Sequence, residues 1–192
     1  MAKVKADYYE KNSSTQARLA DEVLPHHQFS QDDKILDLGC GDGKITAKLA
    51  DLSPQGTAMG IDPSEDMIRH ARKHYAAQRD NLSFEEGLAE DKYPRDSFTL
   101  ITSFSALHWV KNLQQTFEHG YDALQAGGKF LALTCPQESV YWRVFDEVLH
   151  QSAFKDYLPQ SGMSFMKTSA QLKALVDEAG FTVLIWDVLE VE

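Results

Sequence analysis

The stretch LDLGCGDGKITAKLA, residues 36–50, decides the fold of this chain. The short apolar segment Lys34–Leu38 is typical of a buried strand, and the apolar residues after position 44 recur at helical spacing. Between them stand Gly39, Gly41 and Gly43. Glycine is unfavourable in regular structure, so this density predicts a tight turn where a ligand approaches the backbone closely.

The rest of the chain repeats the alternation of strand and helix. Further strands are expected at Thr57–Ile61, Leu82–Glu86, Phe98–Ser103, Lys129–Thr134 and from Phe181 to the end. Helices are expected at 13–24, from Ser64 onward, at 113–124 with a stop at Gly127-Gly128, at 138–151 and at 169–179. This order predicts an α/β fold with a doubly wound, mostly parallel Rossmann-like sheet and helices on both faces. Ligands of such sheets bind beyond the carboxyl ends of the strands.

Composition limits the functions that fit. The chain has 192 residues, 43% of them hydrophobic, which predicts a single domain over residues 1–192. The net charge of −10 makes nucleic acid an unfavourable partner. No segment approaches the roughly 20 apolar residues of a membrane span, and no signal peptide is visible. With two cysteines, Cys40 and Cys135, we expect a cytoplasmic protein without a disulfide framework.

The spacing of the glycines does not match either of two common nucleotide-binding loops. A dinucleotide loop requires G-x-G-x-x-G, but here its last glycine would fall on Lys44. The phosphate loop G-x-x-x-x-G-K-[ST] is also absent. The chain instead has an acidic residue followed by G-x-G-x-G, at Asp37, Gly39, Gly41 and Gly43.

In this pattern the sequence resembles the class I S-adenosylmethionine-dependent methyltransferases over nearly its whole length. The resemblance implies that S-adenosylmethionine lies against the loop, including Cys40, with an acidic group near its ammonium. It implies that Asp62, at the end of the next strand, binds the ribose hydroxyls, and that Pro63 and Met67 lie beside the adenine.

The loops after the third and fourth strands complete the expected site. The family often has Gly-Asp-Ala-Glu after the third strand, with the Asp on the adenine amine, but this chain has Leu88 in place of that Asp. The resemblance then leaves the backbone of Ala89 and apolar packing to hold the adenine. After the fourth strand, it places Ser103 and Phe104 beside the cofactor.

His108 and Trp109 follow in the same loop and are the candidate catalytic residues, facing the methyl acceptor. A structural histidine and a core tryptophan are the alternatives for this pair. His70 and His74 stand at i and i+4 without an evident third ligand, so no metal site is expected.

Within the class, the order of motifs is similar to the trans-aconitate and juvenile hormone acid carboxyl methyltransferases. The resemblance places Tyr9, with Tyr8 as an alternative, and Gln16 over the methionine end of the cofactor and the acceptor carboxylate. A polar helix position is the other interpretation of Gln16.

The expected activity is methyl transfer to a small carboxylic acid. A carboxylate is ionised at neutral pH and needs no base, whereas a hydroxyl or amine acceptor would need one, for which His108 is the candidate. An anionic acceptor also needs a cation, for which Arg18 and Arg143 are candidates. An acid bound to acyl carrier protein, or cofactor binding without catalysis, are the alternatives.

Two further expectations concern the second half of the chain. Residues 137–168, rich in apolar side chains, are expected either to cover the substrate or to pack on the sheet. Class I methyltransferases usually have a seventh, antiparallel strand, for which no segment is left here, so either the chain is shortened or that hairpin is absent. We expect the sixth strand to pair with the fifth or with another chain, and an unpaired edge to favour self-association.

Overall fold

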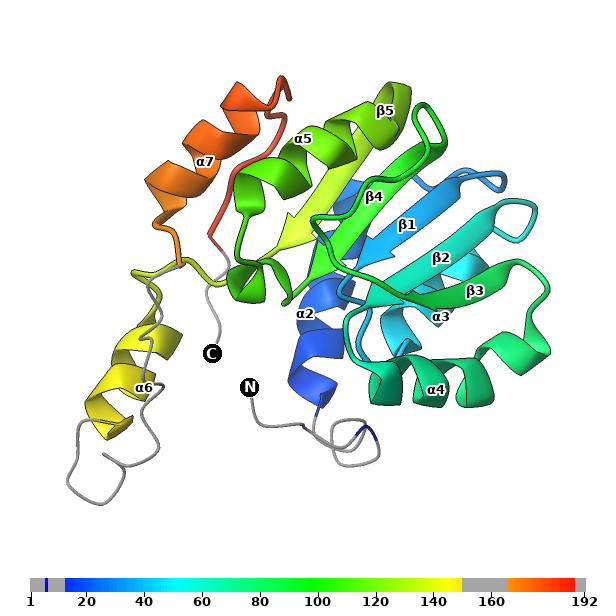
Figure 1. Ribbon diagram of the computed structural model, residues 1–192, viewed down its shortest axis with the longest axis horizontal. Helices are drawn as coiled ribbons and strands as arrows, with labels where there is room; N and C mark the ends of the chain where they lie inside the picture. Colours follow the sequence, from blue (N-terminus) through cyan, green and yellow to red (C-terminus); the bar gives the residue numbers. More distant parts are fainter. Residues whose placement is uncertain (1–5, 7–12, 150–165, 189–192) are drawn as a thin grey trace.

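The computed structural model describes Ala6, residues 13–149 and residues 166–188. Its centre is a parallel sheet of five strands in the order β3-β2-β1-β4-β5 (Figure 1). The strands are β1 (Lys34–Leu38), β2 (Thr57–Asp62), β3 (Leu82–Glu86), β4 (Phe98–Phe104) and β5 (Leu124–Leu133). The order reverses at β1, next to which β2 and β4 both lie in parallel. This confirms the doubly wound, Rossmann-like α/β fold.

The helices connect successive strands or flank them. They are α2 (Ser14–Val23), α3 (Lys44–Leu52), α4 (Glu65–His74), α5 (Leu113–Ala123), α6 (Val140–Leu149) and α7 (Ser169–Glu178). Three single 3₁₀ turns lie at η1 (Leu24–His26), η2 (Ala76–Gln78) and η3 (Leu107–Trp109). Within the described part of the chain, no helix is both long and apolar enough to cross a bilayer, and no cluster of potential metal ligands occurs.

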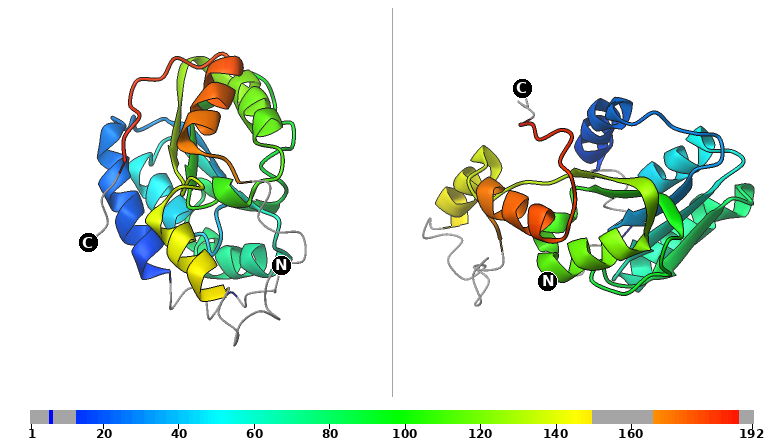
Figure 2. Two further views of the ribbon diagram at one scale, coloured as in Figure 1. Left: turned by 90° about the vertical axis from the view of Figure 1, so that its left-hand side faces the viewer. Right: turned by 90° about the horizontal axis from the view of Figure 1, so that it is seen from above.

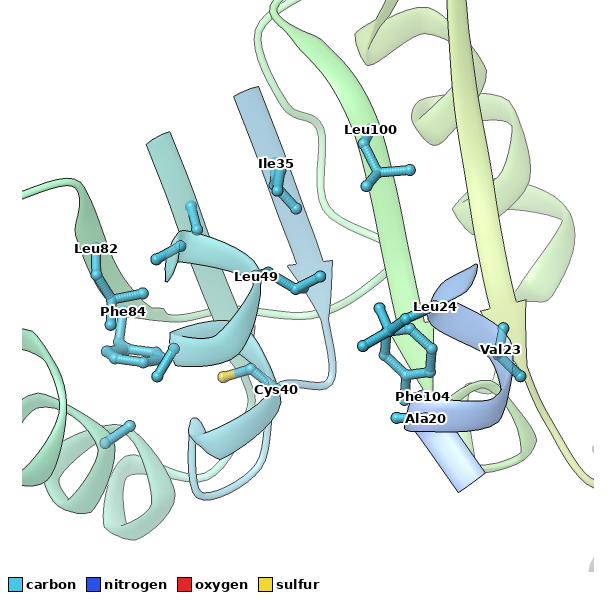
Figure 3. Close-up of a cluster of buried hydrophobic side chains, with 14 of the residues drawn as sticks. Ala20, Val23, Leu24, Ile35, Cys40, Leu49, Leu82, Phe84, Leu100 and Phe104 are labelled. Atoms are coloured by element: carbon cyan, nitrogen blue, oxygen red, sulfur yellow. The ribbon is translucent and has the colours of Figure 1, made fainter. Parts of the chain in front are cut away.

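Helices cover both faces of the sheet (Figure 2). On one face, residues of α2, α3 and α4 pack on the strands, with Leu49 and Ile35 fully buried among them (Figure 3). On the other face, α5 packs against α7 through Phe117 and Leu172. The strands are buried from both sides, which is why they read as short continuous apolar runs in the sequence.

The predicted sixth strand is wrong. Residues 181–188 form no strand, and they follow α7 along the outside of the sheet. Phe181 packs edge-on against Tyr121 and Phe130, with ring centroids 5.2 and 5.7 Å apart, and Trp186 Nε1 donates a hydrogen bond to Ser169 Oγ. These contacts to α5, β5 and α7 hold the segment without ladder pairing to β5, so the expected pairing with the fifth strand does not occur in the described residues.

The fifth strand also begins earlier than expected. Helix α5 ends at Ala123, and β5 starts at once because Leu124 pairs with Phe98. Gly127 and Gly128 therefore lie inside the β5 segment, beside an irregularity in its register with β4, and they are not the helix stop that we expected.

Helix α6 lies within the predicted helix 138–151. Val140 and Tyr141 are exposed, whereas Trp142 is buried. Of the expected cover at 137–168, residues 150–165 lie outside the described part.

Candidate cofactor and acceptor site

The glycine loop after β1 is held from two sides. The amides of Gly39 and Cys40 both donate to the carbonyl of Ile61 in β2, at 2.8 and 2.9 Å. Gly39 has φ +76°, and a Cβ there would lie 2.2 Å from the Cβ of Ala106 in the β4–α5 loop. Only glycine leaves room for Ala106 at this position. The loop that carries His108 can therefore pack directly against the glycine loop.

The third glycine of the loop, Gly43, permits close packing between helices and the sheet. Gly43 has φ +86°, and a Cβ there would meet the Cβ of Ala71 at 2.6 Å and the ring of Phe84 at 2.7 Å. It therefore allows the start of α3 to approach α4 and β3. The side chain of Cys40 points into the same buried cluster (Figure 3), where burial raises the pKa of its thiol. Cys40 is only 7% exposed, and it is one of the residues that line the cleft described below.

Asp62, at the end of β2, faces the glycine loop. Its Oδ2 accepts the amide of Gly41 at 3.0 Å and its Oδ1 accepts the amide of Ser64 at 2.9 Å. Burial raises the pKa of Asp62 although both amides oppose this shift. The two amides fix the carboxylate at the mouth of the loop, and each oxygen keeps a lone pair for a ligand hydroxyl.

Asp37 is the most deeply buried carboxylate of the site. Only 2% of the residue is exposed, and its oxygens accept hydrogen bonds from Thr46 Oγ1 at 2.6 Å and Thr102 Oγ1 at 2.8 Å. Burial raises its pKa to about 6, with the charge of Asp62 adding to the shift and the two threonines opposing it. Asp37 is therefore largely ionised at neutral pH, in a place where a negative charge is costly.

A cleft lies between the glycine loop and the N-terminal end of α2. Its lining includes Asp37, Gly41 and Phe104 from the sheet side and Gln16 from α2. Gln16 Oε1 is buried there and has no hydrogen-bond partner among the described atoms. A buried amide oxygen without a partner is unfavourable, and a ligand that donates to it would remove the cost.

The structure also places two residues in the cleft that we did not single out from the sequence. Asp42, 3% exposed, accepts a hydrogen bond from Ser13 Oγ and forms an ion pair with Lys44, whose Nζ lies 3.2 Å from Asp42 Oδ2. In the sequence, the only indication of this was that Asp42 lies within the glycine triplet and that Lys44 directly follows it.

Ser103 does not line this cleft. It is fully buried, and its hydroxyl donates to the carbonyl of Leu38 at 2.8 Å, which ties the end of β4 to the end of β1. Tyr9, together with Tyr8, lies outside the described residues.

The expected adenine side lies around the ends of β2 and β3. Met67 is buried at the start of α4, where its amide donates to Ser64 Oγ, while Pro63 is exposed. Ala89 packs against the sheet cluster, and Leu88 is 50% exposed.

The neighbouring Glu90 connects this side to the expected acceptor side of the site, a role that we did not foresee. Its Oε1 accepts the backbone amides of Lys111 and Asn112, and its carbonyl accepts a hydrogen bond from the side-chain amide of Gln115. The β3–β4 loop is thereby bonded to the loop that carries His108 and Trp109.

His108 and Trp109 lie in η3 and belong to an aromatic cluster. Their rings are 5.1 Å apart, and each lies edge-on or nearly so to Trp142 of α6, at 5.6 and 5.5 Å. Trp142 is buried and donates from Nε1 to the carbonyl of Cys135, whereas Trp109 is 43% exposed. Trp109 therefore has an accessible surface at the carboxyl end of the sheet and is not a core residue.

Two polar groups lie close to Nδ1 of His108. Its Nδ1 accepts the backbone amide of Cys135 at 3.5 Å and lies 3.3 Å from Thr134 Oγ1. Burial lowers the pKa of His108 to about 4, so the ring is neutral at pH 7. Because a backbone amide can only donate, the Cys135 contact favours the tautomer with the single ring proton on Nε2, in which Thr134 Oγ1 also donates to Nδ1.

Comparison with known proteins agrees with this geometry. Residues 29–180 match the family described as "Methyltransferase domain". The chain belongs to this methyltransferase family. It is 33% identical over 138 residues to the juvenile hormone acid O-methyltransferase of Bombyx mori, covering 67% of this chain and 49% of that protein. It is 35% identical over 123 residues to the trans-aconitate 2-methyltransferase of Deinococcus radiodurans, covering 64% and 44%.

Among solved structures, the fold matches the chain found with the Trm112 methyltransferase activator of Haloferax volcanii. The TM-score is 0.71 at 22% identity, covering 94% of this chain and 77% of that one. The class I S-adenosylmethionine-dependent methyltransferase resemblance is thus confirmed for family and fold. The chain spans about half the length of these two curated methyltransferases.

Proposed function

We propose that this chain binds S-adenosylmethionine in the cleft and transfers its methyl group to the carboxylate oxygen of a small organic acid. The observation that carries the proposal is the arrangement of two carboxylates, the buried Asp37 and the half-buried Asp62, on either side of a glycine loop. A phosphate-bearing ligand would be repelled there, whereas a ligand with an ammonium and a sugar is attracted.

Three residues match chemical groups of this cofactor. Asp62 offers a fixed carboxylate to the ribose hydroxyls, Asp37 offers a charge to the ammonium, and the orphaned Gln16 Oε1 offers an acceptor to a donor group. When bound, S-adenosylmethionine supplies a methyl group on a sulfonium, so that the acceptor oxygen bonds to this carbon as the carbon–sulfur bond breaks. The protein then needs to position the acceptor in line, which is where most of the acceleration arises.

The tautomer of His108 favours a carboxylate acceptor. In the tautomer that the Cys135 amide favours, the ring presents the Nε2 proton, and Nδ1 is the nitrogen that accepts from the amide. A donor holds an oxygen that is already ionised, whereas a hydroxyl acceptor would need a base. Of the two arginines that we considered as the cation for the acceptor, Arg18 forms an exposed pair with Glu22, and Arg143 is exposed on α6. We therefore assign the orienting contact to His108 and the adjacent apolar surface to Trp109.

The test is an acceptor screen with isotopically labelled S-adenosylmethionine. We expect base-labile methyl esters from a panel of organic and acyl acids, and no product from phenols or amines. His108→Gln, which keeps a donor, should retain most of the rate, and His108→Leu should lose about 10-fold or more. Esters formed only on carrier-bound acids would favour the carrier-protein alternative. Cofactor binding without any product would favour a non-catalytic binding protein.

A further inference from the structure

Two loops of the site meet at Glu90, in the connection between β3 and β4. Its side-chain Oε1 accepts the backbone amides of Lys111 and Asn112 at 3.2 and 3.3 Å. Its backbone carbonyl accepts a hydrogen bond from Gln115 Nε2 at 3.0 Å and lies 2.7 Å from His119 Nδ1. All of these contacts are with α5 or with the two residues before it. Glu90 thereby joins its own turn to the start of α5 through both its side chain and its backbone.

The turn that carries Glu90, residues 88–91, is held by hydrogen bonds of its own. The Leu88 amide donates to Asp91 Oδ2 at 2.7 Å, and the Asp91 amide donates to the Leu88 carbonyl at 3.0 Å. Tyr93 Oη donates to the same carbonyl at 2.7 Å, and its ring packs against the sheet. We call residues 88–91 the adenine-side turn, because they lie on the expected adenine side of the site. A ligand that contacts this turn therefore acts on a connected unit that includes Glu90.

The loop from β4 to α5 is anchored at both ends. At its start, Ser105 has φ +55°, which is unfavourable for a residue with a Cβ, and its amide donates to the Leu133 carbonyl at 2.8 Å. At its end, the bonds to Glu90 come two and three residues after Trp109. Trp109 is exposed between these anchors. Its orientation therefore depends on where Glu90 holds the end of the loop.

We infer that Glu90 is a positioning residue that transmits cofactor binding to Trp109 on the acceptor side. The inference rests on the proposed function, because it requires a nucleoside on the adenine side. A nucleoside that contacts the adenine-side turn fixes Glu90, and Glu90 fixes the start of α5 through two backbone amides. Trp109 is thereby oriented for the acceptor without any contact between Glu90 and the reacting groups. The connection is a continuous chain of hydrogen bonds and covalent backbone.

The reach of the Glu90 side chain is more important here than its charge. One oxygen accepts both amides, at the long end of the range for such hydrogen bonds. Aspartate keeps the charge but draws the oxygen back by about 1.5 Å, which breaks both contacts. Glutamine loses the charge, but its side-chain carbonyl oxygen has the same reach and can accept both amides. If the carboxylate acted only as an anion near the positive end of the α5 dipole, aspartate would be the better replacement.

The experiment follows Trp109 fluorescence on addition of saturating adenosine, with binding measured in parallel by calorimetry. Adenosine has the adenine and the ribose but lacks the amino-acid end of the cofactor, so a response at Trp109 has to be transmitted through the protein. The Trp109 response is the part of the emission change that is absent in Trp109→Phe. We expect this response in the wild type and in Glu90→Gln. Glu90→Asp and Glu90→Ala should bind adenosine but lose the response, and their Lys111 and Asn112 amides should exchange with deuterium about 10-fold faster.

Glu118→Ala is the matched control. Glu118 is an exposed acid of α5 whose side chain bonds to Gln114 in the same helix, so its removal changes the net charge equally and should leave the response intact. Three results would overturn the inference and leave the proposed function standing: a response that survives in Glu90→Asp, a response that is lost in Glu90→Gln, or a wild type that binds adenosine without any response at Trp109. A wild type that binds neither adenosine nor S-adenosylhomocysteine would overturn both.

Discussion

Replacing Asp37 with asparagine should make the protein more stable and at the same time a poorer binder. Burial raises the pKa of Asp37 from 3.8 to about 6, so the ionised form costs about 3 kcal/mol in the folded state at pH values above 6. Asparagine is neutral, and its amide can bond to both Thr46 and Thr102. We expect Asp37→Asn to raise the free energy of unfolding by up to about 3 kcal/mol at pH 8. Each kcal/mol raises the Tm of a domain of this size by ~2–4 °C.

The pH dependence gives the sign of this effect. A carboxyl group whose pKa is raised by folding destabilises the protein as pH rises from 3.8 to 6, so the gain of the variant should vanish near pH 4. The assay is urea unfolding followed by circular dichroism at pH 4 and pH 8. Affinity for S-adenosylhomocysteine should fall about 10- to 100-fold in the variant, because the ammonium loses its charged partner.

Asp33 provides the matched control. It is also buried, but hydrogen bonds from Thr99 Oγ1 and Ser30 N outweigh the effect of burial and hold the pKa of Asp33 below its usual value. Asp33→Asn should therefore destabilise the protein at pH 8 and leave cofactor binding unchanged. An Asp37→Asn variant that is less stable at pH 8, or that binds as well as the wild type, would refute the assignment of a strained, ligand-facing carboxylate.

Three other substitutions test separate parts of the site. Gly43→Ala should lower the free energy of unfolding by about 2 kcal/mol or more, because a Cβ there meets Ala71 and the Phe84 ring; urea unfolding at wild-type stability would contradict the packing argument. Asp62→Asn should weaken adenosine and S-adenosylhomocysteine alike, by about 10-fold or more in calorimetry, and equal affinity would remove Asp62 from the sugar site. Leu88→Asp restores an acceptor on the adenine side and should raise S-adenosylhomocysteine affinity about 3- to 10-fold, whereas reduced affinity would show that exposed Leu88 makes an apolar contact instead.

Much of the fold could be predicted because the relevant signals are local. The apolar runs at β1 to β4 are short, buried on both faces and bounded by turn residues, so their period and length identify them. The glycine triplet also identified the loop correctly, since its positive φ values and close contacts exclude most other residues.

The predictions that failed concern features that are determined by tertiary contacts. The segment from Phe181 has strand-like composition, but its aromatic contacts with α5 and β5 hold it off the sheet. Gly127-Gly128 is a strong stop signal, yet the pairing of Leu124 with Phe98 ends the helix earlier. No local pattern indicates such long-range pairing.

The same limit applies to the candidate site. The sequence indicated Asp37, Asp62 and Gln16 through a family resemblance, and the structure brings Asp37 and Gln16 into one cleft with Asp62 at the edge of its loop. It could not show that Lys44 and Asp42 would face the same space, or that His108 would have its Nδ1 occupied by a backbone amide, because both depend on where distant segments meet.

The most direct test of the account is a crystal structure of the chain with S-adenosylhomocysteine bound. We predict both ribose hydroxyls within about 3 Å of the Asp62 carboxylate and the ligand's ammonium facing Asp37 across the glycine loop. A nucleoside found elsewhere on the protein, or an Asp62 carboxylate that makes no contact with the sugar, would contradict it.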